Sequence, residues 1–346
     1  MDTYAWDEIH AAMFSMGSDT SRGSHTTSAS VLTPPNSDGA SDSPVPAQIA
    51  VSSTFGPDAA WQRSANQGPG HVASPPDIAL LTSDRVNFYI HSSTIDTSSH
   101  RLSGRVPSVR GKAPPIVIDV PETAAVLNVI LHALHGLSCA QYSPSLDVLV
   151  EAVERMLSYG MDPKSTVVPS TSLFSLLLSQ APLYPLRVFT LAAHYDIIDL
   201  AVPTSSHLLS FQLSALTDAD VQRMGPVYLR RLMFMHNGRV DALRRVLVSP
   251  PYPHPPTAAC DFANQKSLNR AWALATAYLA WDIRPDVSTG AIEAALRPLA
   301  ARLPCKLCRQ ALDERIKSVV TQWSVVKVCS VQILALPMLI CLQRTI

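Results

Sequence analysis

The chain has 346 residues, of which 47% are hydrophobic and 16% are charged, so it is long enough to bury one or two cores. Lys and Arg balance Asp and Glu at 27 each, and nucleic-acid binding driven by phosphate charge is therefore not expected, because it needs a basic face. The six cysteines are interpreted as reduced thiols, because the chain starts with acidic residues where a signal or transit peptide needs basic ones. The sequence therefore predicts an intracellular protein of the cytoplasm or nucleus.

Residues 1–76 are predicted to form a disordered tail. Beyond its opening stretch the segment consists mainly of Ser, Thr, Pro, Gly and Ala, which cannot bury enough apolar surface to offset the entropy lost on ordering. One patch near the start has the spacing of a short helix. Two interpretations of this patch stay open: a frayed terminal helix, or a helix that docks on a partner or on the body of this chain. Its apolar residues are Tyr4, Trp6, Ile9, Met13 and Phe14.

Two short apolar runs begin the folded part of the chain. They are residues 78–81 and 86–90, and a polar turn separates them. In the second run apolar and polar side chains alternate, which is the period of a half-buried strand. The sequence therefore predicts a β-hairpin with Phe88 and Ile90 in the core.

A third strand and two helices are predicted after the hairpin. The β-branched run at residues 116–120 is typical of a strand. Apolar side chains from Val126 to Leu134 have the spacing of an amphipathic helix, and a second such stripe runs from Leu146 to Leu157, with a helix start at Ser143. The expected fold class is α+β, a small sheet with helices, followed by an all-helical C-terminal region.

The order hairpin, strand, helix and helix resembles the BTB/POZ interaction domain, in the form abundant in mushroom-forming (basidiomycete) fungi. The resemblance implies a BTB/POZ-like domain at residues 77–160 and a protein that binds other proteins without catalysing a reaction. An alternative from the same resemblance is a substrate adaptor of a cullin-type ubiquitin ligase. The family's opening signature matches this chain at Asp77, Leu80, Ser83, Val86, Phe88, Ile90, His91 and Ile95.

The chain departs from the family pattern after His91. Ser92 stands where the family has Lys, and the next helix of the family carries Phe or Met into the core and often into a dimer interface. Here the stretch 97–105 offers Leu102 as its one large apolar side chain. The departure weakens the expectation of homodimerisation and of a cullin-docking surface. It predicts a monomer at micromolar concentration, or a dimer formed through the helical half.

Residues 165–324 are predicted to form a helical extension, because apolar segments with helical spacing recur along them. Thr217 marks a helix start, Gly225-Pro226 a kink, and Asn237-Gly238 a turn. The sequence PPYPHPP at residues 250–256 is a rigid break. A similar helical half, with the segment PLRVF…AAHY, a late Trp and a Cys-x-x-Cys, occurs in the fungal proteins that the chain resembles.

No motif of a known catalytic site occurs in the sequence. It has no Gly-rich phosphate loop, no Gly-x-Ser-x-Gly and no His-Glu-x-x-His. His91 is interpreted as structural, because no acid or Ser has a spacing that would make it a general base. The sequence therefore predicts a protein that is not an enzyme, with no catalytic residue, no bound cofactor and no metal site.

The pair Cys305 and Cys308 has the Cys-x-x-Cys spacing of a zinc knuckle or of a redox pair. Inert thiols are the favoured interpretation. Zinc would need two more ligands, for which His254, Cys260 or Cys329 would have to fold back. A redox pair normally belongs to a thioredoxin-like α/β unit, which this region is not. From a different functional class, the alternative is a zinc- or thiol-dependent enzyme that uses this pair.

Residues 325–346 form an apolar tail that also carries Lys327, Gln332 and Pro337. Its apolar part, residues 328–342, is shorter than the roughly 20 residues of a spanning helix, so a membrane segment is not expected. Three interpretations stay open: a buried C-terminal segment, a marginal tail anchor if the segment is counted from Ser318, or intron-encoded residues in a gene model.

Overall fold

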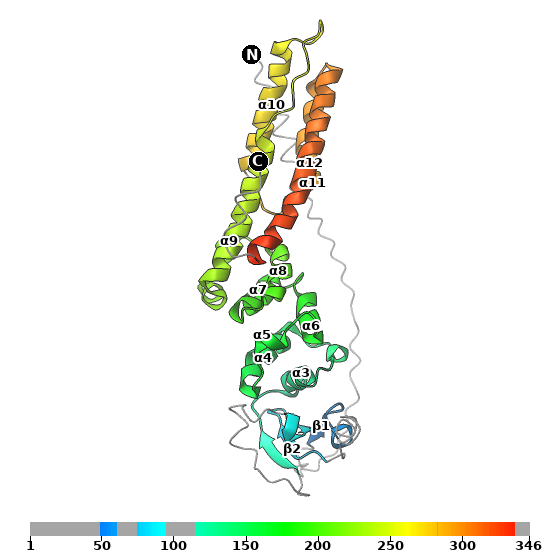
Figure 1. Cartoon of the computed structure of the whole chain (residues 1–346), viewed down its shortest axis with the longest axis vertical. Helices are drawn as coiled ribbons and strands as arrows, with labels where there is room; N and C mark the ends of the chain where they lie inside the picture. Colours follow the sequence, from blue (N-terminus) through cyan, green and yellow to red (C-terminus); the bar gives the residue numbers. More distant parts are fainter. Residues whose placement is uncertain (1–48, 61–74, 95–114, 282, 336–346) are drawn as a thin grey trace, which may run out of the picture. The chain divides into compact units, whose positions relative to one another are not determined.

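The computed structural model describes residues 49–60, 75–94, 115–281 and 283–335. Within them the chain forms one four-stranded sheet and a larger number of helices, so the predicted α+β class is confirmed (Figure 1). The strands and α-helices are β1 (Ala50–Val51), β2 (Ile78–Leu81), β3 (Val86–Ile90), β4 (Ile116–Asp119), α3 (Ala124–Leu134), α4 (Leu146–Arg155), α5 (Pro163–Thr166), α6 (Ser172–Gln180), α7 (Pro185–His194), α8 (Ile198–Ser205), α9 (Asp218–Val248), α10 (Phe262–Trp281), α11 (Thr289–Leu296) and α12 (Lys306–Ala335).

The sheet has the strand order β1-β3-β2-β4. β2 and β3 are antiparallel, with Leu80 opposite Phe88, and β4 lies parallel to β2. The predicted hairpin and third strand are therefore confirmed. Phe88 and Ile90 are 2% and 1% exposed, as expected for the apolar positions of a strand that alternates in polarity.

Residues 49–60 belong to the sheet domain, although the sequence assigned them to the disordered tail of residues 1–76. β1 pairs in parallel with β3, and the side chain of Phe55 is fully buried. The tail prediction is wrong for this segment, because a two-residue strand among Ser, Pro and Gly has no period that a sequence pattern can reveal. Residues 1–48 and 61–74, with the patch from Tyr4 to Phe14, lie outside the described residues.

His91 ties this added segment to the hairpin. Its Nε2 lies 3.1 Å from the carbonyl oxygen of Ala60. One residue further on, the backbone N–H of Ser92 donates to the Asp77 carboxylate at 2.7 Å. The bond between Ser92 and Asp77 holds the end of β3 to the start of β2, and the contact with Ala60 gives His91 a structural partner.

The helices α3 and α4 pack against each other beside the sheet, and Leu127, Ile130, Leu149 and Val153 are fully buried. The helix α4 begins after Ser145, whose hydroxyl caps it, and so starts later than the predicted position.

Two hydrophobic cores organise the described residues. The first extends from Phe55 to Met235 and joins the sheet to the helices α3, α4, α6, α7 and α8 and to the first half of α9. The second extends from Leu243 to Trp323 and joins the end of α9 to α10, α11 and α12. The boundary predicted between residues 160 and 165 therefore does not separate two cores, because the division falls within α9.

The helix α9 begins as the sequence predicts, with a capping box between Thr217 and Asp220. Gly225 has φ 73° and ψ 166°, so the predicted kink is confirmed at a conformation that favours glycine. The predicted turn at Asn237-Gly238 is wrong, because the helix continues through it. The neighbouring side chains of His236 and Arg239 are buried, and packing outweighs the roughly 1 kcal/mol that glycine costs inside a helix.

The helix α12 continues past residue 324 to Ala335, into the segment that the sequence treated as an apolar tail. Residues 336–346 lie outside the described part of the chain. Among the described residues, no helix combines the length and the apolar character needed to cross a membrane.

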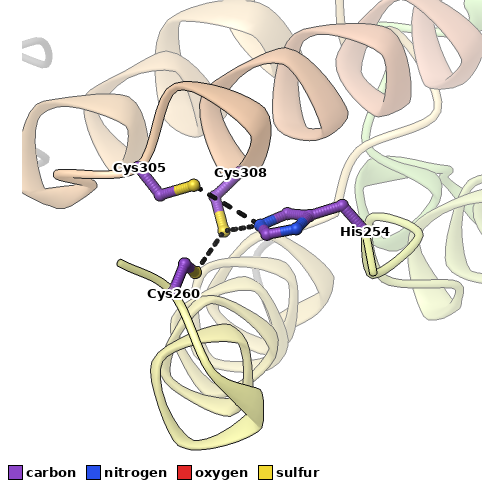
Figure 2. Close-up of side chains that lie close together, drawn as sticks. All are labelled: His254, Cys260, Cys305 and Cys308. Carbon is purple, nitrogen blue, oxygen red and sulfur yellow. Dashed lines mark hydrogen bonds between the residues drawn. The ribbon is translucent and has the colours of Figure 1, made fainter. Parts of the chain in front are cut away.

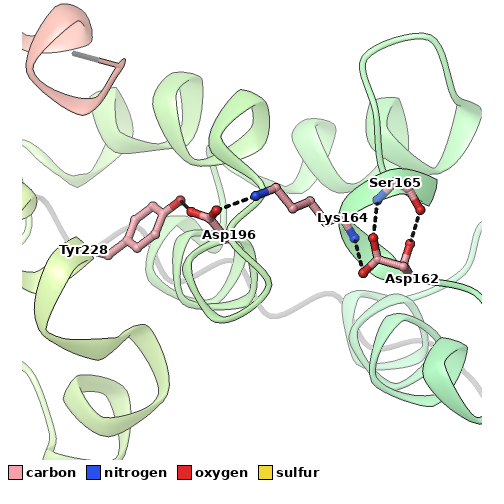
Figure 3. Close-up of polar contacts among 5 residues, drawn as sticks. All are labelled: Asp162, Lys164, Ser165, Asp196 and Tyr228. Carbon is pink, nitrogen blue, oxygen red and sulfur yellow. Dashed lines mark hydrogen bonds and ion pairs between the residues drawn. The ribbon is translucent and has the colours of Figure 1, made fainter. Parts of the chain in front are cut away.

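A small polar network joins α5, the residues after α7 and the helix α9 (Figure 3). The carboxylate of Asp196 accepts hydrogen bonds from Tyr228 Oη at 2.7 Å and from Lys164 Nζ at 2.5 Å. These two bonds, the Lys164 bond first, lower the pKa of Asp196. Burial and the same carboxylate raise the pKa of Tyr228, so its hydroxyl stays protonated and donates.

Replacing Asp196 with Asn is expected to lower the free energy of unfolding by about 1 kcal/mol at neutral pH. Asn tolerates the left-handed φ of 54° at this position, so the change removes charge with little backbone strain. Since the pKa of Asp196 is depressed by folding, its stabilisation is present above the ordinary carboxyl pKa of about 4 and is lost as the pH falls through the folded pKa.

Urea unfolding of the wild type and of Asp196→Asn across this pH range measures the difference between their free energies of unfolding. This difference should become smaller as the pH falls. The matched control is Asp313→Asn, at an exposed position of α12. An Asp196→Asn difference equal to that of the control would contradict the prediction.

Candidate metal centre

The second core holds the end of α9, the start of α10 and the first turns of α12 close together. Trp272 Nε1 of α10 donates to the carbonyl oxygen of Leu247 at 3.0 Å. The guanidinium of Arg315, on α12, donates to the carbonyl oxygens of Val246 at 2.5 Å and Ser249 at 2.8 Å. These bonds hold the C-terminal end of α9 against α10 and α12.

Residues 249–261, between α9 and α10, form a proline-rich loop. Its prolines lack N–H groups and have a restricted φ, so the loop is stiff and cannot continue the helix. Near its end, Thr257 and Cys260 exchange two backbone hydrogen bonds, of 2.9 and 3.1 Å. This tight turn holds the Cys260 side chain in a buried position.

The sequence pair Cys305 and Cys308 lies at the start of α12. Cys305 directly precedes the first residue of the helix, and Cys308 lies in its first turn. Cys308 is buried, and Cys305 is partly exposed. Free N–H groups and the positive end of the helix dipole at such a terminus stabilise a thiolate.

His254, Cys260, Cys305 and Cys308 converge on one point, with their ligand atoms all within 4.8 Å of one another (Figure 2). The Sγ atoms of Cys260 and Cys308 are 3.7 Å apart. His254 Nε2 lies 3.3 Å from the Sγ of Cys308 and 3.4 Å from that of Cys305. Three sulfurs and one imidazole nitrogen therefore surround a space the size of a single ion.

The three thiols differ in acidity. Hydrogen bonds from the backbone N–H of Cys308, and then of Leu307, lower the pKa of Cys305 to about 7. Burial, followed by the neighbouring thiols, raises the pKa of Cys308 to about 12, and burial also raises that of Cys260. The cluster thus combines one thiol whose pKa is lowered with two whose pKa is raised.

A small cavity of about 10 Å³, roughly the space of one water molecule, lies beside the cluster. Pockets that hold small-molecule substrates measure about 300 to 1,000 Å³, so this cavity is below that range. Its lining includes Tyr252, His254, Gln265, Leu268 and Cys308.

The structure brings together the Cys305 and Cys308 pair singled out in the sequence and two of the residues named as ligands that would have to fold back, His254 and Cys260. The side chain of Cys329 lies outside the described residues. His91 belongs to the sheet domain and takes no part in the cluster. The sequence does not predict that His254 and Cys260 lie close to Cys305 and Cys308, because the packing of α9, α10 and α12 sets the distance between the two pairs.

A scan against protein-family models and searches of curated proteins and of solved structures found no match to this chain. The BTB/POZ resemblance therefore stays a prediction.

Proposed function

We propose that the protein acts by binding other proteins, without catalysis, through a BTB/POZ-like module and its helical extension. The order of β2, β3, β4, α3 and α4 supports the module, because it is the order that the resemblance implies. The observation that carries the binding role lies in the extension, on the solvent-facing side of α10.

Large apolar side chains occupy one exposed stripe of α10. Leu274, Tyr278 and Trp281 have the i, i+4, i+7 spacing of a single helix face and are 49%, 42% and 92% exposed. The opposite face is already packed, with Leu268 and Trp272 buried in the second core. Single exposed apolar residues are ordinary, but a stripe with Tyr and Trp is typical of a binding surface.

The charge of α10 indicates the chemistry of the partner. Lys266 and Arg270 are exposed and precede Leu274 on the same i, i+4 line. No acidic residue occurs between positions 262 and 281. The surface formed by these five residues, here called the α10 face, suits a segment of another protein that combines apolar side chains with Asp or Glu, since complementary charges favour association.

A selection from a displayed library of random peptides tests this function. Full-length protein is expected to enrich peptides that carry Leu, Ile or Phe together with Asp or Glu. The triple variant Leu274→Ser, Tyr278→Ser, Trp281→Ser should weaken their binding by about thirtyfold or more, because an interface aromatic is typically worth 2 kcal/mol or more.

The matched control is Leu183→Ser with Tyr184→Ser, which removes apolar side chains that are 74% and 47% exposed between α6 and α7. The control should bind as the wild type does. Enriched peptides that bind the triple variant equally well, or no enrichment, would overturn the proposal. Self-association in light scattering that the triple variant abolishes would show a second copy as the occupant, and would also overturn it.

A further inference from the structure

We propose that His254, Cys260, Cys305 and Cys308 bind one zinc ion in a closed, structural site. This inference goes beyond the protein-binding role and is independent of it. It follows from the positions of the four side chains, the orientation of the imidazole and the connections that the site makes.

The spacing of the donor atoms fits tetrahedral zinc. With Zn–S bonds of about 2.3 Å and a Zn–N bond of about 2.0 Å, a tetrahedron places two sulfurs about 3.8 Å apart and a sulfur and a nitrogen about 3.5 Å apart. The distances here are 3.7 Å between the Cys260 and Cys308 sulfurs, and 3.3 and 3.4 Å from His254 Nε2 to Cys308 and Cys305. All the distances between the four donor atoms are within 4.8 Å, so small side-chain movements would bring the longest of them to the tetrahedral value.

The imidazole of His254 is oriented as in a metal ligand. Its Nδ1 lies 2.7 Å from the carbonyl oxygen of Pro255, which can only accept, and 3.4 Å from the Gln265 amide nitrogen; the shorter contact places the proton on Nδ1. The lone pair is then on Nε2, the nitrogen that faces the sulfurs (Figure 2). Hydrogen bonding of the second ring nitrogen to a carbonyl is the usual arrangement of a histidine bound to zinc. The Gln265 amide also donates to the backbone carbonyl of His254 at 2.9 Å and holds this residue in place.

The donor set selects the metal. Three thiolates and an imidazole suit zinc, whereas calcium and magnesium require oxygen ligands. On binding, Zn²⁺ forms one bond to each of the three sulfurs, all as thiolates, and one to Nε2, and each thiol that is still protonated releases its proton to solvent. No oxidant or reductant takes part. The complex has a net charge of −1, next to the positive N-terminus of α12.

Four protein ligands complete the coordination of zinc, so no position is left for a water molecule or a substrate. Such closed sites are structural, whereas catalytic sites keep an open position. The ion would join two segments distant in the sequence, the loop at residues 249–261 and the first turn of α12. This loop contains the seven-residue sequence PPYPHPP and has little regular secondary structure of its own. Zinc therefore supplies the cross-link that a proline-rich loop otherwise lacks.

Titration of the reduced, metal-free full-length protein with cobalt(II) tests the proposal. Tetrahedral cobalt bound by thiolates gives visible d–d bands and a sulfur-to-metal charge-transfer band. The expected result is saturation at about one equivalent, followed by complete loss of these bands when zinc is added, because zinc binds such sites more tightly than cobalt.

Variants identify the ligands. His254→Ala is expected to weaken cobalt binding by about tenfold or more, whereas His254→Cys should retain a four-ligand tetrahedral site. Cys305→Ser and Cys308→Ser should each lose the tetrahedral spectrum. The controls are Cys139→Ala, which removes a buried cysteine of the first core, and His207→Ala, which removes an exposed histidine. Both should match the wild type.

Circular dichroism of each variant shows whether it is folded, and the wild-type titration stands by itself if a variant is not. A folded, reduced wild-type protein that gives no tetrahedral cobalt spectrum would overturn the proposal. Equal binding by Cys139→Ala and by a double Cys305→Ser, Cys308→Ser variant would overturn it as well. A Cys260–Cys308 disulfide that persists under reducing conditions would assign the cluster to thiol chemistry instead.

Discussion

Replacing Phe55 with Ala is expected to lower the free energy of unfolding by about 3 to 5 kcal/mol. Phe55 is fully buried, and its ring lies 5.1 Å from that of His132 and 6.1 Å from that of Phe88, measured between centroids. Its carbonyl oxygen also accepts the backbone N–H of Tyr89 at 2.7 Å, so the residue is anchored to β3. A cavity left at this point cannot collapse easily, because the sheet and α3 both border it.

The matched control is Val51→Ala, in β1 of the same segment, where the side chain is 51% exposed. Its effect should be about 0.5 kcal/mol or less, as for most surface substitutions. Urea unfolding followed by circular dichroism measures both. Equal effects of the two substitutions would mean that residues 49–60 are not part of the core.

Zinc at a thousandfold excess over its Kd is expected to raise the free energy of unfolding by about 4 kcal/mol, because a ligand that binds only the folded state stabilises it by mass action. Thermal unfolding of metal-free and zinc-loaded protein measures this difference. The same comparison for Cys260→Ser should show little dependence on zinc, whereas Cys139→Ala should respond as the wild type does.

Amide hydrogen exchange locates the effect. Removal of zinc should increase exchange in residues 249–261 and in the first turn of α12, and leave β2 and β3 unchanged. An unfolding temperature that does not respond to zinc, in protein shown to bind it, would contradict a structural role for the ion.

The sequence was sufficient for elements with strong local patterns. The alternation around Phe88 predicted β3, and the Thr217 and Asp220 pair predicted the start of α9. Gly225-Pro226 predicted the kink, because proline removes a hydrogen bond and glycine permits positive φ. In each case the physical cause lies within a few residues along the chain.

The failures occur where distant packing decides the structure. β1 is two residues long and exists because β3 offers it a parallel edge. The helix α9 continues through Asn237-Gly238 because Arg239 packs over the ring of Trp323, with its guanidinium carbon 4.3 Å from the ring centroid, and donates to the carbonyl oxygen of Pro285 at 2.6 Å. These partners lie far along the chain and leave no local signal.

The candidate site combines both situations. Cys305 and Cys308 are recognisable by their spacing, but no second Cys-x-x-Cys pair occurs in the sequence, so the sequence alone favours inert thiols. His254 lies within a proline-rich break, where a histidine has no periodic context, and Cys260 ends a tight turn. Their approach to α12 depends on the bonds of Arg315 to Val246 and Ser249 and on the packing of the second core.

The metal content of full-length protein, purified under reducing conditions without chelator or added metal, tests the central claim most directly. Inductively coupled plasma mass spectrometry is expected to find about one zinc per chain in the wild type and in Cys139→Ala. The double variant Cys305→Ser, Cys308→Ser should contain none. A folded, reduced wild-type protein that contains no zinc and takes up none on addition would contradict the account, and iron in place of zinc would contradict the assignment of the metal.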